Sequence, residues 1–101
     1  METFTRVSVQ KAHEIIQSGN VNIVDVRDAD AFAQGHMAQA QILNDENIKD
    51  FLQETDKEEP LICYCYHGIS SQQAARFFAD QGFKHVYSID GGWEEWKAVY
   101  G

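Results

Sequence analysis

The fold is decided by residues 61–71, Leu61-Ile62-Cys63-Tyr64-Cys65-Tyr66-His67-Gly68-Ile69-Ser70-Ser71. The first five are apolar or aromatic and uncharged, which is typical of a strand buried on both faces of a parallel sheet. The loop after them contains Gly68, which can adopt a positive φ, and ends in two serines, either of which can cap a helix. The apolar residues that indicate this helix are Ala74, Ala75, Phe77 and Phe78.

Cys65 is the candidate nucleophile of this stretch. Backbone N–H groups in a short turn form an anion-binding hollow, and the helix behind the turn adds roughly half a positive elementary charge at its N-terminus. Cysteines in such places have pKa values of roughly 3.5 to 7.5 instead of about 8.5. The sequence therefore predicts a thiol that is ionised at neutral pH. The alternative is a small buried residue near the end of a strand, as most free cysteines are.

Cys63 is expected in the core. Residues two apart on an extended strand stand about 6.6 Å apart, near the upper limit for a disulfide. A zinc site built from Cys63, Cys65 and His67 would lack a fourth ligand, and the chain has no C-x-x-C or H-x-x-x-H pair to complete it. We therefore expect no disulfide, no metal and no cofactor.

The length of 101 residues predicts one compact domain over residues 1–101. Pro60 is the only proline, and no glycine- or serine-rich stretch marks a linker. The first residues lack the basic start and apolar run of a signal peptide, and no segment approaches the roughly 18 apolar residues of a membrane span. We expect a soluble cytoplasmic protein that does not act at a membrane.

The formal net charge is −8, from 16 acidic and 8 basic residues. No cluster of Lys or Arg interrupts this composition, which argues against nucleic acid as a partner. A small anionic substrate needs a locally positive pocket, yet no Arg or Lys occurs between Pro60 and Arg76. The loop after Cys65 therefore offers backbone N–H groups, hydroxyls, an imidazole and a helix end. We expect weak binding of an anionic donor.

Helix and strand signals alternate along the rest of the chain. Ser8 can cap a first helix that ends at Gly19, Asp28 can cap a second that ends at Gly35, and Asn44 opens a third. The residue pattern predicts strands at 21–26, 40–43, 61–65 and 86–89 and a last helix at 93–100. This alternation predicts an α/β fold with a parallel sheet and helices on both faces. Ligands of such sheets lie beyond the carboxyl ends of the strands, where Cys65 is expected.

Three separated motifs resemble the signature stretches of the rhodanese sulfurtransferases. They are Asp25-Val26-Arg27 with Phe32 and Gly35-His36, the cysteine loop, and Gly91-Gly92-Trp93 with Trp96, in the usual order. Within that family, residues 65–71 and 86–92 are similar to the bacterial single-domain GlpE type. The resemblance spans nearly the whole chain. It implies a rhodanese-like single domain with a central, mainly parallel sheet of about five strands and helices on both faces.

The resemblance implies the activity of a thiosulfate sulfurtransferase. Cys65 would take the outer sulfur of thiosulfate as a persulfide, release sulfite, and pass the sulfur to a thiophile such as cyanide or a dithiol. Thioredoxin-like proteins are acceptors by resemblance only. The catalytic residue is then Cys65, and the substrate-binding loop comprises Tyr66, His67, Gly68, Ile69, Ser70 and Ser71.

The loop departs from that of many rhodaneses, which place an arginine or lysine in it to hold the thiosulfate oxygens. Tyr66 and His67 stand in this loop instead, and a substrate role for His67 stays open beside plain loop packing. Rhodanese-like phosphatases place an arginine six residues after the cysteine, where this chain has Ser71. Without that bidentate clamp on a phosphate group, phosphatase activity is not expected.

The other polar residues of the motifs are expected to be structural. Asp25 is expected to accept N–H bonds from its loop rather than to form an active-site ion pair. Arg27 is expected to tie neighbouring loops together. His36 is expected to be a hydrogen-bonded packing residue rather than an acid–base catalyst, because persulfide chemistry needs little proton transfer.

The remaining histidines and the two tryptophans are expected to have structural roles. His13 and His85 are expected on the surface. Trp93 and Trp96 lie three residues apart, which is the spacing of core residues on one helix face. Stacking of these indoles on a substrate is the alternative.

Two functions of different classes remain open. The first is a sulfurtransferase enzyme. The second is a rhodanese-like sulfur-carrier or redox-sensing module, in which Cys65 acts with a protein partner. The intact cysteine loop favours the enzyme, because silent members of the family commonly lose that cysteine.

Overall fold

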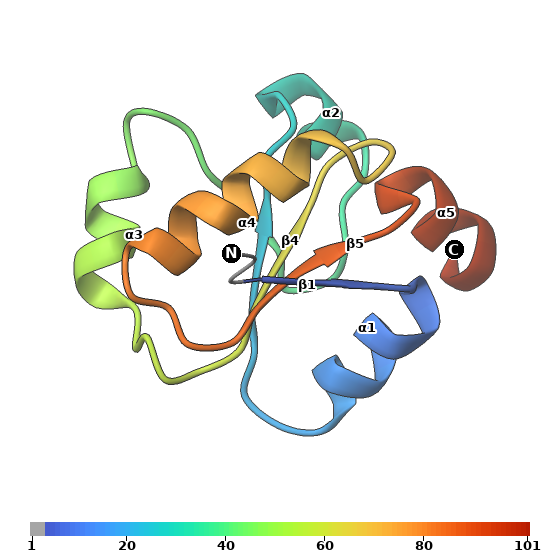
Figure 1. Ribbon diagram of the computed structural model, residues 1–101. Coiled ribbons are helices and arrows are strands. Elements are labelled where there is room, and N and C mark those ends of the chain that lie inside the picture. Colours follow the sequence, from blue (N-terminus) through green and yellow to red (C-terminus); the bar gives the residue numbers. More distant parts are fainter. Residues whose placement is uncertain (1–3) are drawn as a thin grey trace.

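The computed structural model describes residues 4–101, which form one sheet flanked by helices (Figure 1). The sheet has five strands in the order β1-β5-β4-β2-β3, and all neighbouring strands are parallel. The predicted α/β fold with a parallel sheet is confirmed. The strands are β1 (Thr5–Val7), β2 (Asn22–Asp25), β3 (Gln41–Ile42), β4 (Leu61–Tyr64) and β5 (Val86–Ile89). The helices are α1 (Val9–Gln17), α2 (Ala29–Gln34), α3 (Ile48–Glu54), α4 (Ser70–Asp80) and α5 (Gly92–Tyr100).

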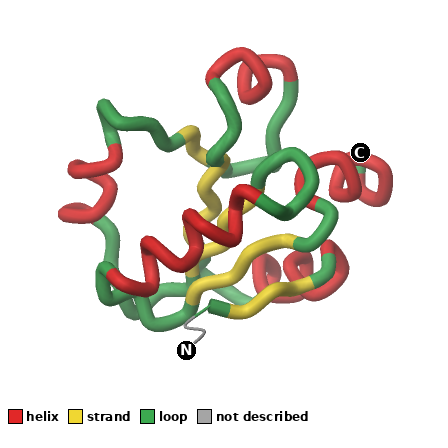
Figure 2. The backbone as a smooth tube through the Cα atoms, turned by 45° about the horizontal axis from the view of Figure 1, so that its top comes forward, coloured by secondary structure: helices red, strands yellow, loops and turns green. Residues whose placement is uncertain are grey.

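The central strand β4 has two hydrophobic clusters on its two faces. Leu61 and Cys63 belong to a cluster that includes side chains of α3 and α4, whereas Ile62 and Tyr64 belong to a second cluster with side chains of α1 and α5. Helices accordingly lie on both sides of the strands (Figure 2). Successive strand residues point to opposite faces, so a strand covered on both sides is apolar throughout. All four residues of β4 are buried, which explains its uncharged sequence.

Local capping signals are confirmed at the first two helices. The Ser8 hydroxyl accepts a hydrogen bond from the amide of Lys11, and the Asp28 carboxylate accepts one from the amide of Ala31. The second helix ends at Gly35, as expected. These caps satisfy N–H groups that the first helical turn leaves without partners. Asp28 thereby orients α2 at the carboxyl edge of the sheet.

Two helix starts were predicted wrongly. Neither Ser70 nor Ser71 caps α4, because Ile69 is the N-cap residue and no side chain makes a capping hydrogen bond. The third helix begins at Ile48, because the Asn44 side chain first accepts hydrogen bonds from the amides of Glu46 and Asn47 and forms a separate turn. An Asn side chain that bonds to nearby backbone amides stabilises a turn in competition with a helix.

The strand β1 was not predicted. It pairs only with β5, at the edge of the sheet, and of its three residues only Val7 is buried. An exposed three-residue edge strand has little of the apolar pattern on which sequence prediction depends. The strand β4 also ends at Tyr64, one residue earlier than predicted, so Cys65 is the first residue of the loop.

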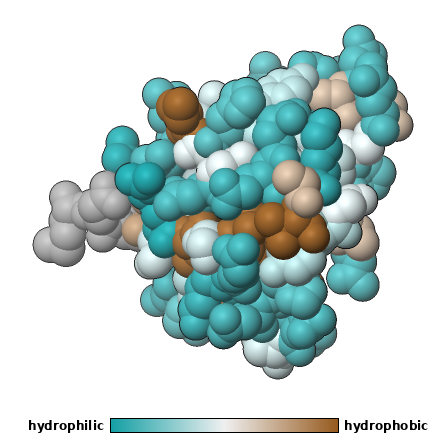
Figure 3. All heavy atoms as spheres, turned by 90° about the vertical axis from the view of Figure 1, so that its right-hand side faces the viewer, coloured by the Kyte–Doolittle hydropathy of each residue, from teal (hydrophilic) through white to brown (hydrophobic). Residues whose placement is uncertain are grey.

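The surface fits the acidic, polar composition. On the face shown in Figure 3, hydrophilic residues cover most of the area and a hydrophobic band lies near the middle. Among residues 4–101, no helix has the length and apolar character that crossing a bilayer requires.

Candidate functional site

Cys65 lies beneath the backbone of the loop that connects β4 to α4. Its Sγ accepts hydrogen bonds from the amide of Gly68 and the amide of Ser71, both at 3.2 Å. Ser71 is the second residue of α4, so the sulfur faces the N-terminal end of that helix, as predicted. Only 5% of the residue is exposed. The arrangement places several N–H dipoles around one sulfur atom.

The hydrogen-bond donors around Cys65 favour its ionised form. Burial opposes ionisation of the thiol, but hydrogen bonds from the Ser71 hydroxyl and from the amides of Ser71, Gly68 and His67 outweigh it, and the pKa of Cys65 falls below its ordinary value. Cys63 shows the opposite behaviour, because burial raises the pKa of its thiol. The sulfur atom that the sequence singled out is thus the activated one of the pair.

The start of α5 holds the loop in this shape. The amide of Trp93 donates to the carbonyl oxygen of Cys65 at 2.8 Å, and the amide of Glu94 donates to that of Tyr66 at 3.1 Å. The carbonyl oxygen of Gly68 accepts from the side chain of Gln72 at 2.8 Å. Because these carbonyl groups are bound elsewhere, the loop can present N–H groups to the sulfur.

Gly68 is required by a close approach of two backbones. Its φ is +90°, and a Cβ atom there would lie 2.8 Å from both the amide nitrogen of Gly91 and the carbonyl oxygen of Ile89. The atoms that exclude a side chain here belong to the end of β5 and the connection after it. Gly68 therefore lets the loop dock onto that connection.

A cavity of about 270 Å³ opens beside the thiol. Cys65 and four loop residues line it, namely Tyr66, His67, Ile69 and Ser70. Gly68 and Ser71 contact the sulfur instead. The structure thus brings together all seven residues predicted for the site. No lysine or arginine lines this cavity, as the sequence of the loop indicated.

Tyr66 is held at the outer edge of the loop. Its hydroxyl donates to the Asp28 carboxylate at 3.1 Å, and the guanidinium carbon of Arg27 lies 5.4 Å from the centre of its ring. Tyr66 and Ile69 are 40% and 75% exposed. Apolar surface at the entrance of the cavity is therefore open to an approaching molecule.

Sequence reasoning did not identify Ser88, which is fully buried on β5. Its Oγ lies 2.8 Å from the Oγ of Ser71, which is 3.4 Å from the Sγ of Cys65. The available signal was a hydroxyl within an otherwise apolar strand, since a buried polar group needs a hydrogen-bond partner. The identity of that partner depends on the tertiary structure.

Asp25 and Arg27 form a buried ion pair at the end of β2. The carboxylate accepts from the amide of Arg27 at 2.8 Å, as expected. The expectation that it would do so instead of forming an ion pair is wrong, because it also accepts from the guanidinium, with 2.6 Å between Arg27 Nη2 and Asp25 Oδ2. Arg27 also donates to the carbonyl oxygen of Gly35 at 2.7 Å, which ties two loops together as predicted. The guanidinium lies 5.2–5.6 Å from three ring centres, those of Tyr64, Tyr66 and Trp93. With its charges paired, this group stiffens the wall behind Tyr66.

Two of the three imidazoles outside the loop stack on aromatic rings. His36 lies on the ring of Phe32, and its Nδ1 is 2.9 Å from the Phe32 carbonyl oxygen. His85 is exposed, as expected. His13 was expected to be a plain surface residue, but it is only partly exposed and stacks on Tyr100, with 4.5 Å between ring centres. Interaction between their rings covers one face of the imidazole.

The two tryptophans are only partly buried. Trp93 and Trp96 pack against the cluster on the α1 and α5 side of the sheet. The core contact that was predicted is therefore present, but neither indole is enclosed. Trp93 also lies over Arg27.

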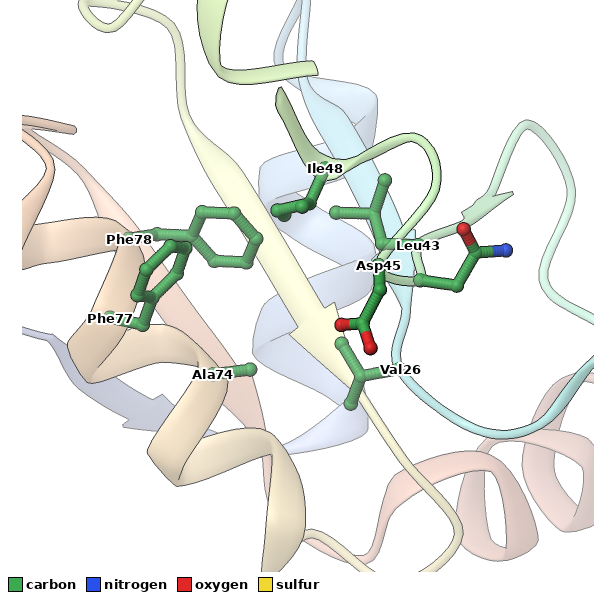
Figure 4. Close-up of a pocket in the computed structure, with 8 residues that line it drawn as sticks. Val26, Leu43, Asp45, Ile48, Ala74, Phe77 and Phe78 are labelled. Carbon is green, nitrogen blue, oxygen red and sulfur yellow. The ribbon is translucent and has the colours of Figure 1, made fainter. Parts of the chain in front are cut away.

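A second cavity, of about 310 Å³, lies between α4 and the segment that leads into α3 (Figure 4). Ala74, Phe77 and Phe78 lie on one side of it, and Leu43, Asp45 and Ile48 lie on the other. Its lining contains no thiol, imidazole or cationic side chain. Within residues 4–101, no group of three or more His, Cys, Asp or Glu side chains could hold a metal ion.

Comparison with known sequences identifies related proteins over nearly the full length of the chain. The family model described as a rhodanese-like domain matches residues 8–99. A protein of Ectopseudomonas mendocina named thiosulfate sulfurtransferase GlpE is 46% identical over 100 residues, which cover 99% of this chain and 91% of that protein. The protein of the same name from Shewanella oneidensis is 44% identical over 96 residues, which cover 95% of each chain.

Solved structures agree with this relationship. The rhodanese-like domain of an Anabaena protein superposes with a TM-score of 0.81 and 25% identity, covering 100% of this chain and 77% of that one. A rhodanese-like domain protein from Staphylococcus aureus has a TM-score of 0.77, with 24% identity and coverage of 92% and 91%, and shows the likeness of fold. The family match over residues 8–99 and the relatives at 44–46% identity establish that the chain belongs to the rhodanese-like domain family.

Proposed function

We propose that this protein is a thiosulfate sulfurtransferase that carries sulfane sulfur as a persulfide on Cys65. The observation that carries the proposal is the pair of amide hydrogen bonds to Cys65 Sγ, from Gly68 and Ser71 at 3.2 Å each. They favour the thiolate, which is the nucleophilic form of cysteine. Relatives at 44–46% identity carry the name of this activity.

The first half-reaction loads the sulfur. The Cys65 thiolate attacks the outer sulfur of thiosulfate, a new S–S bond forms, and the old S–S bond breaks with its electron pair leaving on sulfite. Charge is conserved, since a monoanion and a dianion yield an anionic persulfide and the sulfite dianion. The amides around the sulfur stabilise the negative charge without reorganising during the reaction.

The second half-reaction unloads the sulfur. A thiophile such as cyanide attacks the terminal sulfur of the persulfide, thiocyanate leaves, and the electron pair of the broken S–S bond returns to Cys65 as thiolate. A dithiol acceptor would leave as a disulfide with release of hydrogen sulfide. The two half-reactions follow one another on one cysteine, which predicts ping-pong kinetics.

Loop groups other than lysine or arginine would bind the donor. The cavity offers the hydroxyl of Ser70 and the imidazole of His67, together with N–H groups of the loop, whereas the Tyr66 hydroxyl already donates to Asp28. Neutral donors bind an anion less strongly than a guanidinium does. We therefore propose weak, readily reversible binding of thiosulfate. A cytoplasmic location belongs to the same proposal and is supported by two cysteines that are both free thiols.

The test is formation of thiocyanate from thiosulfate and cyanide. The wild-type protein should turn over, Cys65→Ser should be inactive, and Cys63→Ala should remain active because Cys63 lies in the core. After thiosulfate alone, mass spectrometry should find about 32 Da, one sulfur atom, added to the peptide at Cys65. Addition at Cys63 would refute the assignment of the nucleophile. A persulfide on Cys65 without turnover above the Cys65→Ser level would support a sulfur carrier instead of an enzyme.

A further inference from the structure

The side chains of Ser88, Ser71 and Cys65 form a buried series of hydrogen bonds that ends at the sulfur of Cys65. Ser88 lies on β5, Ser71 on α4, and Cys65 directly after β4. The Oγ atoms of the two serines are 2.8 Å apart, and Ser71 Oγ is 3.4 Å from Cys65 Sγ. Both serines have no exposed surface. Figure 1 shows β4 and β5 side by side with α4 packed across them, which is the arrangement that lets this series form.

The ionisation state of Cys65 fixes the direction of these hydrogen bonds. A serine hydroxyl has one proton to donate and two lone pairs to accept with. When Cys65 is a thiolate, Ser71 must donate its only proton to the sulfur, and Ser88 must then be the donor to Ser71. When Cys65 is a protonated thiol, it can donate to Ser71, and Ser71 can donate to Ser88. The two serines can thus follow the charge on the sulfur by rotation of their hydroxyl groups alone.

We infer that Ser88 is a positioning residue, which stabilises the Cys65 thiolate by holding and polarising the hydroxyl of Ser71. Ser88 acts through Ser71, and the structure gives it no hydrogen bond to the sulfur. The inference deepens the proposed function, because the thiolate is the form that attacks the sulfur donor. It can be tested without any sulfur donor.

The hydrogen bonds make the sign of the effect predictable. A hydrogen bond to an ionised group is about twice as strong as one between neutral groups, and bonds in a chain strengthen one another. Loss of the Ser88 hydroxyl therefore weakens the thiolate state more than the thiol state. The Cys65 thiol should become harder to ionise when Ser88 is removed.

Other charges near Cys65 are unchanged in this comparison. Titratable and charged side chains occur on every element packed around Cys65. Before α4 they are Asp25 and Arg27 at the end of β2, Cys63 and Tyr64 on β4, and Tyr66 and His67 in the loop. From α4 onward they are Arg76 and Asp80 on α4, Tyr87 on β5, and Asp90, Glu94, Glu95, Lys97 and Tyr100 after β5. All of them remain in the serine variants described next. A change in the pKa of Cys65 would therefore be caused by loss of the hydrogen bonds that Ser71 and Ser88 make.

The experiment measures the rate of alkylation at Cys65 by iodoacetamide from pH 5 to 10, with the modified peptide identified by mass spectrometry. Ser88→Ala should raise the pKa of Cys65 by about half a pH unit, which lowers the alkylation rate about threefold at pH values below the pKa. Ser88→Thr keeps the hydroxyl and should restore the wild-type profile. Ser71→Ala should raise the pKa of Cys65 by about one pH unit.

The double variant Ser71→Ala/Ser88→Ala decides whether Ser88 acts through Ser71. It should titrate like Ser71→Ala alone, because residues that act in series are not additive. Val86→Ala is the matched control, since it truncates another buried side chain of β5 and should leave the profile unchanged. The inference is overturned if Ser88→Ala moves the pKa by less than about 0.2 of a pH unit, if the two serine effects add, or if Val86→Ala has the same effect. A protein with this titration but no sulfur transfer would refute the proposed function and leave the role of Ser88 standing.

Discussion

Cys63 and Cys65 are two residues apart, yet the structure gives them opposite chemistry. Cys63 is a β4 residue with no exposed surface, and it belongs to the hydrophobic cluster that contains Phe78. Burial raises the pKa of its thiol. Cys65 is also largely buried, but its sulfur accepts hydrogen bonds from two amides, and its pKa is lowered. Burial alone therefore does not decide whether a cysteine is reactive.

The difference lies in what surrounds each sulfur. Hydrocarbon neighbours disfavour a thiolate, whereas N–H and O–H groups that point at the sulfur replace the water it has lost. The strand ends between the two residues, so one sulfur faces packed side chains and the other faces loop backbone.

The largest expected effect is selective alkylation. Treatment of the native protein with iodoacetamide at pH 7 should modify Cys65 more than about 100-fold faster than Cys63, because only Cys65 has a lowered pKa and lies next to a cavity. Peptide mass spectrometry over time gives both rates. In the unfolded protein the two rates should converge. Comparable rates in the native state would show that the two thiols do not differ in reactivity.

Substitution of Gly68 should remove much of the difference. Gly68→Ala places a Cβ atom 2.8 Å from backbone atoms of Ile89 and Gly91, so the loop must shift and its amides must leave the sulfur. We expect sulfur transfer to fall at least about tenfold, as loss of an anion-stabilising donor does. Gly19→Ala is the control, since it shares a positive φ but has no neighbouring atom within 4 Å. It should lower stability slightly and leave the transfer rate unchanged.

Replacement of Cys63 should lower the stability of the protein and leave the rate of sulfur transfer unchanged. Cys63→Ala should lower the free energy of unfolding by about 1 kcal/mol, because a fully buried sulfur is lost. Cys63→Ser should cost more, since it buries a hydroxyl among apolar side chains. Denaturant unfolding gives both values. The rate of sulfur transfer per folded molecule should match the wild type, and a loss of more than about tenfold in Cys63→Ala would mean that this thiol takes part in the reaction.

As the pH rises, Cys63 should lower the free energy of unfolding and Cys65 should raise it. The pKa of Cys63 is raised by folding, so its contribution is fully present below the unfolded value of about 8.5 and decreases above it, by up to about 1.4 kcal/mol per pH unit. The pKa of Cys65 is lowered, so its contribution is fully present above about 8.5 and is lost as the pH falls through the native value. Between pH 7.5 and 9.5, Cys63→Ala should gain about 1 kcal/mol relative to the wild type. Cys65→Ser should lose stability relative to the wild type over the same interval.

The smallest expected effect is that of salt on the reaction of Cys65. The net charge of −8 repels thiosulfate at long range, and added salt screens that repulsion within about 8 Å at physiological ionic strength. The second-order rate constant with thiosulfate should therefore rise, by about twofold, from low to moderate ionic strength. Alkylation by neutral iodoacetamide is the control and should not change. A steep fall with salt would instead indicate a positively charged entrance.

Most of the fold could be predicted because its signals are local. The apolar run of β4, the caps at Ser8 and Asp28 and the end of α2 at Gly35 depend on neighbouring residues. The first helix was expected to end at Gly19, but it ends at Gln17 with Ser18 as its C-cap. Strand β1 escaped prediction, because it is short, exposed and stabilised by pairing with β5, which lies more than 75 residues away. The serine cap of α4 was wrong because the Ser71 hydroxyl is bound to groups outside its own helix.

Three features follow from residues close together in the chain and could be predicted without coordinates: the thiol that follows a buried strand, the loop that covers it and the family that the motifs resemble. Three other features became visible only in the folded chain. The start of α5 binds carbonyl groups of the loop, Gly68 docks against the connection after β5, and Ser88 lies behind Ser71. These contacts join the loop after β4 and helix α4 to strand β5 and to the start of α5. A hydrogen bond acts over about 3 Å, so its partners are known only when the chain has been folded.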